Sequence, residues 1–261
     1  MITTARALVS GLLALGGSLG LQAANSLDAQ QAFQRCYAFS PRGRVTVENL
    51  YGDVRIIGWD RHEVRIEAIK SGADSGRLDD ARIVVDATAE RVSVRTQYAG
   101  SESQEPASVE YRISVPRTAD LENVRLVNGA LSLSGLAGSV KATSVNGSIR
   151  AEKLEGRADL ATVNGLVEAG FARISASRPI SLRSVNGRIL LSIPSGSGAQ
   201  LIAQNRSGEI EADFEQPARA AGGHHLEAVL QGGGAPISLH NVNGGISIHS
   251  TWSRRRERPG L

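Results

Sequence analysis

The tripeptide Val-Asn-Gly recurs along the second half of the chain at a nearly fixed spacing. Its first three glycines are 18 residues apart, and the fourth follows after 22. Units of this length cannot bury their own apolar face, so they are typical of solenoids, in which each unit stacks on the next. The copies occupy residues 127–129, 145–147, 163–165, 185–187 and 242–244.

Two degenerate copies fit the same frame. They are Leu50-Tyr51-Gly52 and Arg206-Ser207-Gly208. From Gly208 to Gly244 the distance is 36 residues, or two units of 18. We therefore expect one further, unmarked turn between these glycines, around residues 226–233.

Apolar residues recur at fixed offsets on both sides of the tripeptide. Counted from the valine, the offsets are −5, −3, 0, +4 and +6, as in Ile180, Leu182, Val185, Ile189 and Leu191. Alternation on each side of a break predicts two short strands joined by a corner. In this interpretation the valine points into the core, the asparagine turns the corner, and the glycine adopts a left-handed conformation.

A meander of antiparallel hairpins is the rival structure, because Asn-Gly is the strongest short hairpin signal. A hairpin repeat would mirror its pattern across the turn, whereas every copy here has the same direction and offsets. The sequence therefore favours parallel coils spaced by about 4.8 Å, with their asparagines stacked into a hydrogen-bonded ladder. The alternative role for asparagine is that of a tolerated turn former, and both roles are structural. The predicted corner residues are Gly52, Asn128, Gly129, Asn146, Gly147, Asn164, Gly165, Asn186, Gly187, Gly208, Asn243 and Gly244.

Stacking in register also predicts contacts between outward side chains of consecutive copies. Arg150 then lies beside Glu168, and Arg188 lies beside Glu209. Opposite charges on neighbouring strands contribute about 0.2–1 kcal/mol each.

The chain is expected to be all-β, a single-domain β-solenoid of the parallel β-helix type over residues 44–251. Residues 121–251 form the Val-Asn-Gly coils. Residues 44–120 form a wider opening section that caps one end, because an uncovered coil is an aggregation-prone edge. Strands are predicted there at 64–68, 83–85, 92–94 and 109–115, where apolar residues alternate or cluster.

The two ends of the chain are predicted to be a targeting sequence and a basic tail. Residues 1–24 have the charged, apolar and small-residue order of a secretory signal peptide, followed by an N-terminal extension over 25–43. The apolar run is too short to cross a bilayer, so no transmembrane segment is expected after cleavage. A basic tail, 252–261, closes the chain. The single cysteine, Cys36, excludes an intrachain disulfide framework, and pairing between molecules stays open.

Few residues suggest catalysis or metal binding. His224 and His225 are adjacent, so on a strand they would point to opposite faces. His240 and His249 fall on outward positions of their coil. Glu209 and Glu211 share one face and could match the carboxylate spacing of a glycosidase, which keeps a carbohydrate-active enzyme as the alternative. No cofactor or metal is expected.

The segment Val45–Asp60, with its Gly58-Trp59-Asp60 turn signal, combined with the Val-Asn-Gly coils, resembles a bacterial adhesin-like family of β-strand-repeat domains of unknown function. Members resemble the heads of certain autotransporter adhesins. The resemblance covers roughly residues 38–250 and implies an exported β-solenoid with adhesion or envelope roles and without established catalytic residues. Tyr51 and Arg206-Ser207 depart from the pattern.

The sequence thus predicts a non-catalytic module, an adhesin or scaffold, in the periplasm or at the cell surface. The candidate partners are an envelope glycan, an anionic surface, which the C-terminal arginines would favour, or another envelope protein in a signalling role. Nucleic acid is not expected for an exported chain.

Overall fold

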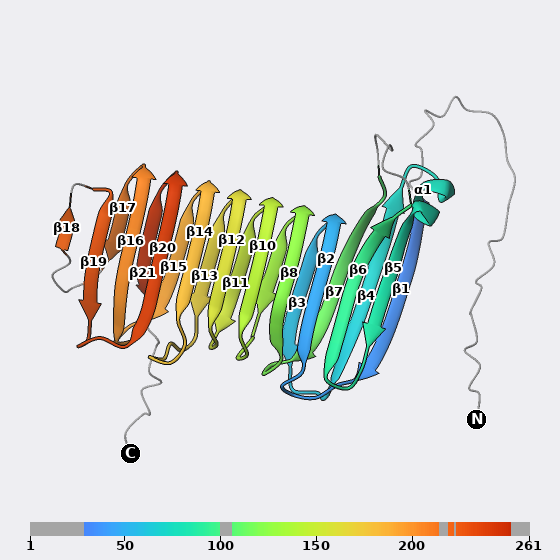
Figure 1. Ribbon diagram of the computed structural model, residues 1–261, viewed down its shortest axis with the longest axis horizontal. Helices are drawn as coiled ribbons and strands as arrows, with labels where there is room; N and C mark the ends of the chain where they lie inside the picture. Colours follow the sequence, from blue (N-terminus) through green and yellow to red (C-terminus); the bar gives the residue numbers. More distant parts are fainter. Residues whose placement is uncertain (1–28, 100–105, 214–218, 222, 252–261) are drawn as a thin grey trace, which may run out of the picture.

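Two large β-sheets face each other across an apolar core and run the length of an elongated stack (Figure 1). The computed structural model describes residues 29–99, 106–213, 219–221 and 223–251. The predicted signal peptide at 1–24 and the predicted basic tail at 252–261 lie outside the described residues. No helix among the described residues is long and apolar enough to cross a membrane.

The first sheet, sheet A, contains ten strands. In spatial order they are β1 (Ala29–Ala38), β4 (Glu63–Gly72), β7 (Ser108–Pro116), β3 (Val54–Trp59), β9 (Leu131–Ser134), β11 (Ile149–Leu154), β13 (Val167–Phe171), β15 (Ile189–Pro194), β21 (Ile246–Thr251) and β17 (Ile210–Asp213).

The second sheet, sheet B, contains eleven strands. In spatial order they are β18 (Arg219–Ala221), β19 (His225–Leu230), β16 (Ala199–Ser207), β20 (Ala235–Asn243), β14 (Ile180–Asn186), β12 (Ala158–Asn164), β10 (Val140–Asn146), β8 (Asp120–Asn128), β2 (Arg44–Tyr51), β6 (Arg91–Tyr98) and β5 (Ala81–Ala87).

Each central coil consists of one strand of sheet B, an Asn-Gly corner and one strand of sheet A. Neighbouring coils pair in parallel and in register, so that Val140 lies opposite Ala158 and Ile149 opposite Val167. Parallel pairing excludes the hairpin meander for these coils and confirms the predicted β-solenoid.

The valine of the tripeptide was predicted to point into the core, but it points outward. Val145, Val163 and Val185 are each about 40% exposed, whereas the residue before each valine is buried. The reason is strand geometry: side chains alternate strictly up to the corner, so the inward positions are −5, −3 and −1. The offset pattern of −5, −3 and 0 breaks that alternation.

The chain leaves spatial order at its C-terminal end. The coil β20–β21 lies between the coils β14–β15 and β16–β17. The unmarked turn predicted around residues 226–233 is therefore wrong as a solenoid coil: β19 runs antiparallel to β16, with Leu230 opposite Ala199. Because a whole coil separates them, Arg188 and Glu209 are not neighbours, which corrects that prediction. The Arg150–Glu168 ion pair is confirmed at 3.4 Å.

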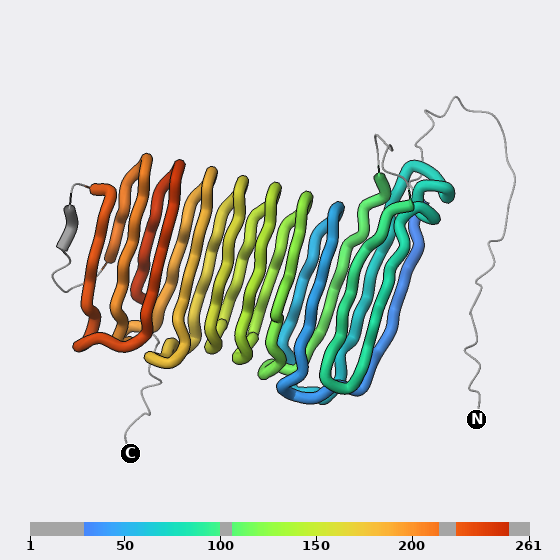
Figure 2. Tube along the Cα trace, viewed as in Figure 1, coloured from blue at the N-terminus to red at the C-terminus, as the bar shows by residue number. Residues whose placement is uncertain are grey.

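The N-terminal end is also rearranged. The coil β2–β3 lies between β8–β9 and the pair β6 and β7, and antiparallel strands β1, β4 and β5 complete this end. All four strands predicted in the opening section are present. The strand β1 and the short helix α1 (Ser75–Asp80), which Asp74 caps by accepting a bond from the Arg77 N–H at 2.9 Å, were not predicted. Figure 2 shows the resulting path of the chain.

Candidate functional site

The predicted asparagine ladder is present at the corners. Each Nδ2 donates to the Oδ1 of the asparagine on the neighbouring coil, over 2.8–3.0 Å. The bonds run from Asn146 to Asn128, from Asn164 to Asn146, from Asn186 to Asn164 and from Asn243 to Asn186. The side-chain amides of the corner asparagines therefore bond to one another and hold the stacked coils together, which is a structural role.

The corner glycines are required for the close approach of neighbouring coils and, at most corners, also for a positive φ. The φ of Gly147 and Gly187 is not positive. A Cβ added at Gly147 would lie 1.9 Å from the carbonyl oxygen of Gly129, and one at Gly187 would lie 1.9 Å from that of Gly165. The expected positive φ is present at five corners, 109° at Gly52, 150° at Gly129, 152° at Gly165, 120° at Gly208 and 130° at Gly244. The prediction is wrong at Gly147 and Gly187 only, where close approach is the reason for glycine.

A second polar column lies inside the corners, which the sequence analysis missed. Its members occupy position −1 and are small polar residues, such as Ser184 and Asn241. Four of them donate to glycine carbonyls of the neighbouring coil: Thr162 to Gly147, Ser184 to Gly165, Asn241 to Gly187 and Asn205 to Gly244, over 2.7–3.2 Å. Ser144, at the same position, is buried and its Oγ has no partner among the described residues. The recurrence of Ser, Thr or Asn at position −1 could have predicted this column from the sequence.

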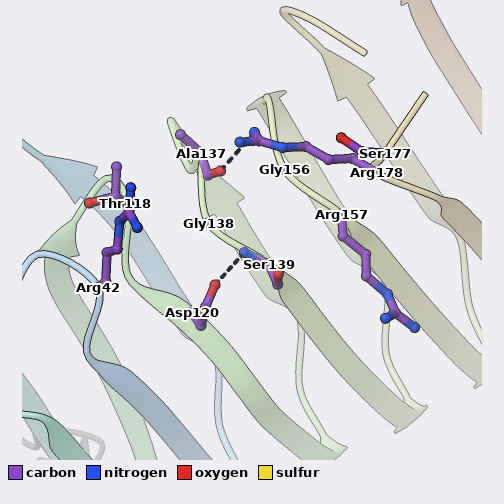
Figure 3. Close-up of a pocket in the computed structure, with 10 residues that line it drawn as sticks. All are labelled: Arg42, Thr118, Asp120, Ala137, Gly138, Ser139, Gly156, Arg157, Ser177 and Arg178. Carbon is purple, nitrogen blue, oxygen red and sulfur yellow. Dashed lines mark hydrogen bonds between the residues drawn. The ribbon is translucent and has the colours of Figure 1, made fainter. Parts of the chain in front are cut away.

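A groove of about 390 Å³ follows the opposite corners, which connect one coil to the next (Figure 3). Its floor is made by Gly138 and Gly156, where a Cβ would lie about 2 Å from the backbone of the coil below. Arg42, Arg157 and Arg178 supply its positive charge. Asp120 is the only carboxylate in its lining, and it accepts a bond from the Ser139 N–H at 2.7 Å.

These three arginines do not converge on one point. Arg178 Nη1 donates to the carbonyl oxygens of Ala137 and Glu155, at 3.2 and 2.8 Å, and so links adjacent corners. Figure 3 shows Arg42 and Arg157 at opposite sides of the groove. Arg178 therefore stabilises the corners, and the three arginines do not form an anion site.

A larger groove of about 810 Å³ crosses the outer face of sheet A near its N-terminal end. Its lining comes from strands that are far apart in sequence, β1, β4, β7, β3, β9 and β11. Strands hold side chains rigidly, so a site on this face is preorganised.

One row of outward side chains runs across this groove. Arg112 of β7 lies opposite Arg55 of β3, Arg55 lies opposite Ser132 of β9, and Ser132 lies opposite Arg150 of β11. We call Arg112, Arg55 and Arg150 the arginine row. Arg55, Ser132 and Arg150 all occupy offset +5 of the repeat, which was a usable signal, but Arg112 lies outside the repeat and could not be placed beside them.

Acidic and apolar side chains complete the groove. Glu67, Glu110 and Asp53 line it, so that the three arginines face three carboxylates. Asp53 is already engaged, because its Oδ1 accepts the Ala130 N–H at 2.8 Å. Ala32 and Ile69, which are opposite each other on β1 and β4 and are both exposed, contribute apolar surface. The groove thus offers cationic, hydrogen-bonding and apolar contacts together.

The core beneath the groove contains a buried hydrogen-bonded cluster. The Thr96 hydroxyl donates to Asn49 Oδ1 at 2.9 Å and lies 2.7 Å from the Tyr111 hydroxyl. Burial raises the pKa of Tyr111 to about 12, although its bond to Thr96 acts in the opposite direction. The cluster keeps β7 fixed against β2 and β6, and so supports Arg112.

The other candidate residues do not assemble into a catalytic site. Glu211 lies opposite Ser247 on β21, and neither groove described above includes Glu209 or Glu211. His225 Nε2 lies 3.0 Å from Glu227, on one edge of sheet B, and His224 is exposed. His240 and His249 lie on outward positions of β20 and β21, and both are exposed. Within the described ranges, no three His, Cys, Asp or Glu side chains could hold a metal ion.

Parallel coils, an asparagine ladder and paired sheets extend over the part of the chain that matches a known protein family. The family model described as Toastrack DUF4097 matches residues 44–249. The chain belongs to this family. No curated protein matches it.

One solved structure shows the same fold at low sequence identity. A candidate cell adhesion protein from Clostridium sporogenes has 11% identity and a TM-score of 0.52, covering 85% of this chain and 100% of its own. A candidate adhesin from Bacteroides fragilis has 9% identity and a TM-score of 0.37, covering 85% of this chain and 97% of its own. The first of these similarities supports the fold of this Toastrack chain.

Proposed function

We propose that this Toastrack protein is an exported, non-catalytic binding module of the cell envelope, an adhesin or scaffold. We further propose that the groove on sheet A is its binding surface. The observation that carries this proposal is the groove itself, a solvent-facing surface on rigid strands that combines cationic, acidic and apolar side chains. Pockets with a few polar groups around an apolar surface are the default binding sites of a fold.

The signal-like residues 1–24 support export, and membership of a family with the fold of a candidate cell adhesion protein supports the adhesin role. The absence of an assembled catalytic constellation among the described residues favours binding over the alternative of a carbohydrate-active enzyme. If the chain instead binds another envelope protein in a signalling role, the same groove is a candidate surface for that contact.

Export is tested by expressing the full chain in a bacterial host, fractionating the cells and sequencing the N-terminus of the recovered protein. We expect a mature chain that begins near residue 25 in the periplasm or medium. A full-length chain retained in the cytoplasm would contradict export.

Binding is tested with the exported chain and isolated bacterial envelopes in a sedimentation assay. The variant Ser132→Trp places a bulky ring in the groove, and Ser181→Trp makes the same change on an outward position of sheet B. We expect Ser132→Trp to weaken binding at least about tenfold, or about 1.4 kcal/mol, while Ser181→Trp binds like wild type. Equal binding by both variants, with unchanged melting curves, would refute the groove as the binding surface.

The enzyme alternative has its own test, incubation of the chain with acidic polysaccharides followed by a reducing-end assay. We expect no turnover. Turnover that disappears in Glu209→Gln or Glu211→Gln would replace the binding proposal with a catalytic one.

A further inference from the structure

The arginine row places like charges directly opposite each other. Arg112 and Arg55 are register partners on adjacent parallel strands, about 4.8 Å apart. Like charges in this position destabilise a sheet. Neither guanidinium has a hydrogen-bond or ion-pair partner among the described residues, although Glu67 lies opposite Arg112. Two unpaired, adjacent arginines on a rigid face are costly for the fold alone and favourable when an anion binds.

The row also has a direction. Because it crosses strands, it follows the long axis of the solenoid, and from Arg112 to Arg150 it spans three strand spacings, about 14 Å. Ser132 lies between Arg55 and Arg150. A single small anion would contact one or two of the arginines, whereas an extended chain with several negative charges would contact all three.

The remaining lining limits which polyanion fits. Three carboxylates balance the three arginines within the groove, so a densely charged phosphate backbone would be repelled as well as attracted. A sugar chain has free hydroxyls between its charges that can donate to Glu67 and Glu110, whereas a DNA backbone has none. Arginine matches the geometry of a carboxylate by two parallel hydrogen bonds. Ile69 on β4, about half exposed, offers an apolar surface for a sugar ring.

We propose that the arginine row binds an acidic polysaccharide that carries carboxylates and lies along the solenoid axis across sheet A. This ligand class rests on the binding role proposed above, but the two fail in different ways. If envelope binding stays sensitive to Ser132→Trp while no acidic polysaccharide binds, the binding role stands and the ligand class is wrong.

The test uses polygalacturonate as the probe and its fully methyl-esterified form as the matched neutral polymer. Binding of the exported chain to each immobilised polymer is measured by biolayer interferometry at several salt concentrations. We expect binding to polygalacturonate that weakens as salt rises, and binding to the ester at least tenfold weaker. Equal binding to both polymers would overturn the proposal.

Two double variants separate the arginine row from net charge. Arg55→Ala/Arg112→Ala removes two charges from the groove, and Arg82→Ala/Arg125→Ala removes two exposed arginines from sheet B. We expect the first to weaken polygalacturonate binding at least tenfold and the second less than twofold, with both variants folded by circular dichroism. Equal weakening by the two variants, or tighter binding of single-stranded DNA of similar length, would refute the assignment.

Discussion

The middle of the solenoid repeats one arrangement, whereas both ends change strand order and direction. Between β8 and β15, every coil pairs in parallel with the coil that precedes it in sequence. At each end, a coil is inserted out of order, β2–β3 at one and β20–β21 at the other, and antiparallel strands complete the sheet. The motif therefore dictates how coils stack, but not which coils become neighbours.

The intact and degenerate motifs follow this division. All intact Val-Asn-Gly copies lie side by side, even though the last is far along the chain. The degenerate copies flank them, with Tyr51 beside Asn128 and Ser207 beside Asn243. An asparagine in the ladder is useful only if its neighbour also has one, so the motif degenerates where the ladder ends.

The candidate binding groove lies where the two regions meet. Ser132 and Arg150 belong to the regular coils, Arg55 to the inserted coil and Arg112 to the N-terminal end. Because β2–β3 is inserted out of order, β7 lies next to β3 and Arg112 joins the row. The irregular end thus adds a third arginine to the row formed by Arg55 and Arg150.

The largest effect is expected from filling a corner in the regular region. In Gly147→Ala, the added Cβ would meet the Gly129 carbonyl oxygen at 1.9 Å, so the coils must separate. We expect a loss of about 3 kcal/mol in the free energy of unfolding, measured by urea denaturation. Gly170→Ala is the control, because its Cβ has only one neighbour, at 3.8 Å. Equal losses in the two variants would contradict close stacking as the reason for the corner glycines.

A smaller effect is expected from the inner polar column at the C-terminal end. Asn241 is fully buried and donates to the Gly187 carbonyl at 3.0 Å, so Asn241→Ala leaves that oxygen without its partner. We expect a loss of about 2 kcal/mol. Asn146→Ala removes two bonds from the exposed ladder, one to Asn128 and one from Asn164, and should cost about 0.5–1 kcal/mol because water replaces both. A larger loss in Asn146→Ala would mean that the outer ladder is the stronger one.

The sequence predicted the regular region well because its information is periodic. The first two bonds of the asparagine ladder and the Arg150–Glu168 pair follow from an offset of 18 residues alone. The bond from Asn243 to Asn186 spans 57 residues and could not follow from it. The position of Arg188 relative to Glu209 could not follow, because the intervening coil comes from residues 235–251. Strand order at the ends depends on long-range pairing, which a repeat offset does not encode. The arginine row was missed for that reason, since Arg112 has no place in the repeat.

A moderate, pH-dependent effect is expected at the N-terminal end. The pKa of Tyr111 is raised to about 12 by burial, against about 10 in an unfolded chain. The folded state therefore holds this proton more tightly, and the resulting stability is complete below pH 10 and is lost as pH rises from 10 to 12. In Tyr111→Phe, urea denaturation should show a shallower decline over that range. Parallel declines for the two proteins would assign the pH dependence to other groups.

The smallest effect on stability is expected in the regular region next to the groove, from Glu168→Gln. The Arg150–Glu168 pair spans 3.4 Å, with 54% and 42% of the two side chains exposed, so its loss should cost no more than about 0.5 kcal/mol. The same substitution frees Arg150 at one end of the arginine row, and polygalacturonate binding should tighten by a few-fold, because a competing carboxylate is gone. Glu152→Gln is the control for the change in charge, because Glu152 is exposed and lies on β11, the strand of Arg150. Tightening in both variants would indicate net charge as the cause, whereas tightening in Glu168→Gln alone would place Arg150 in contact with the ligand.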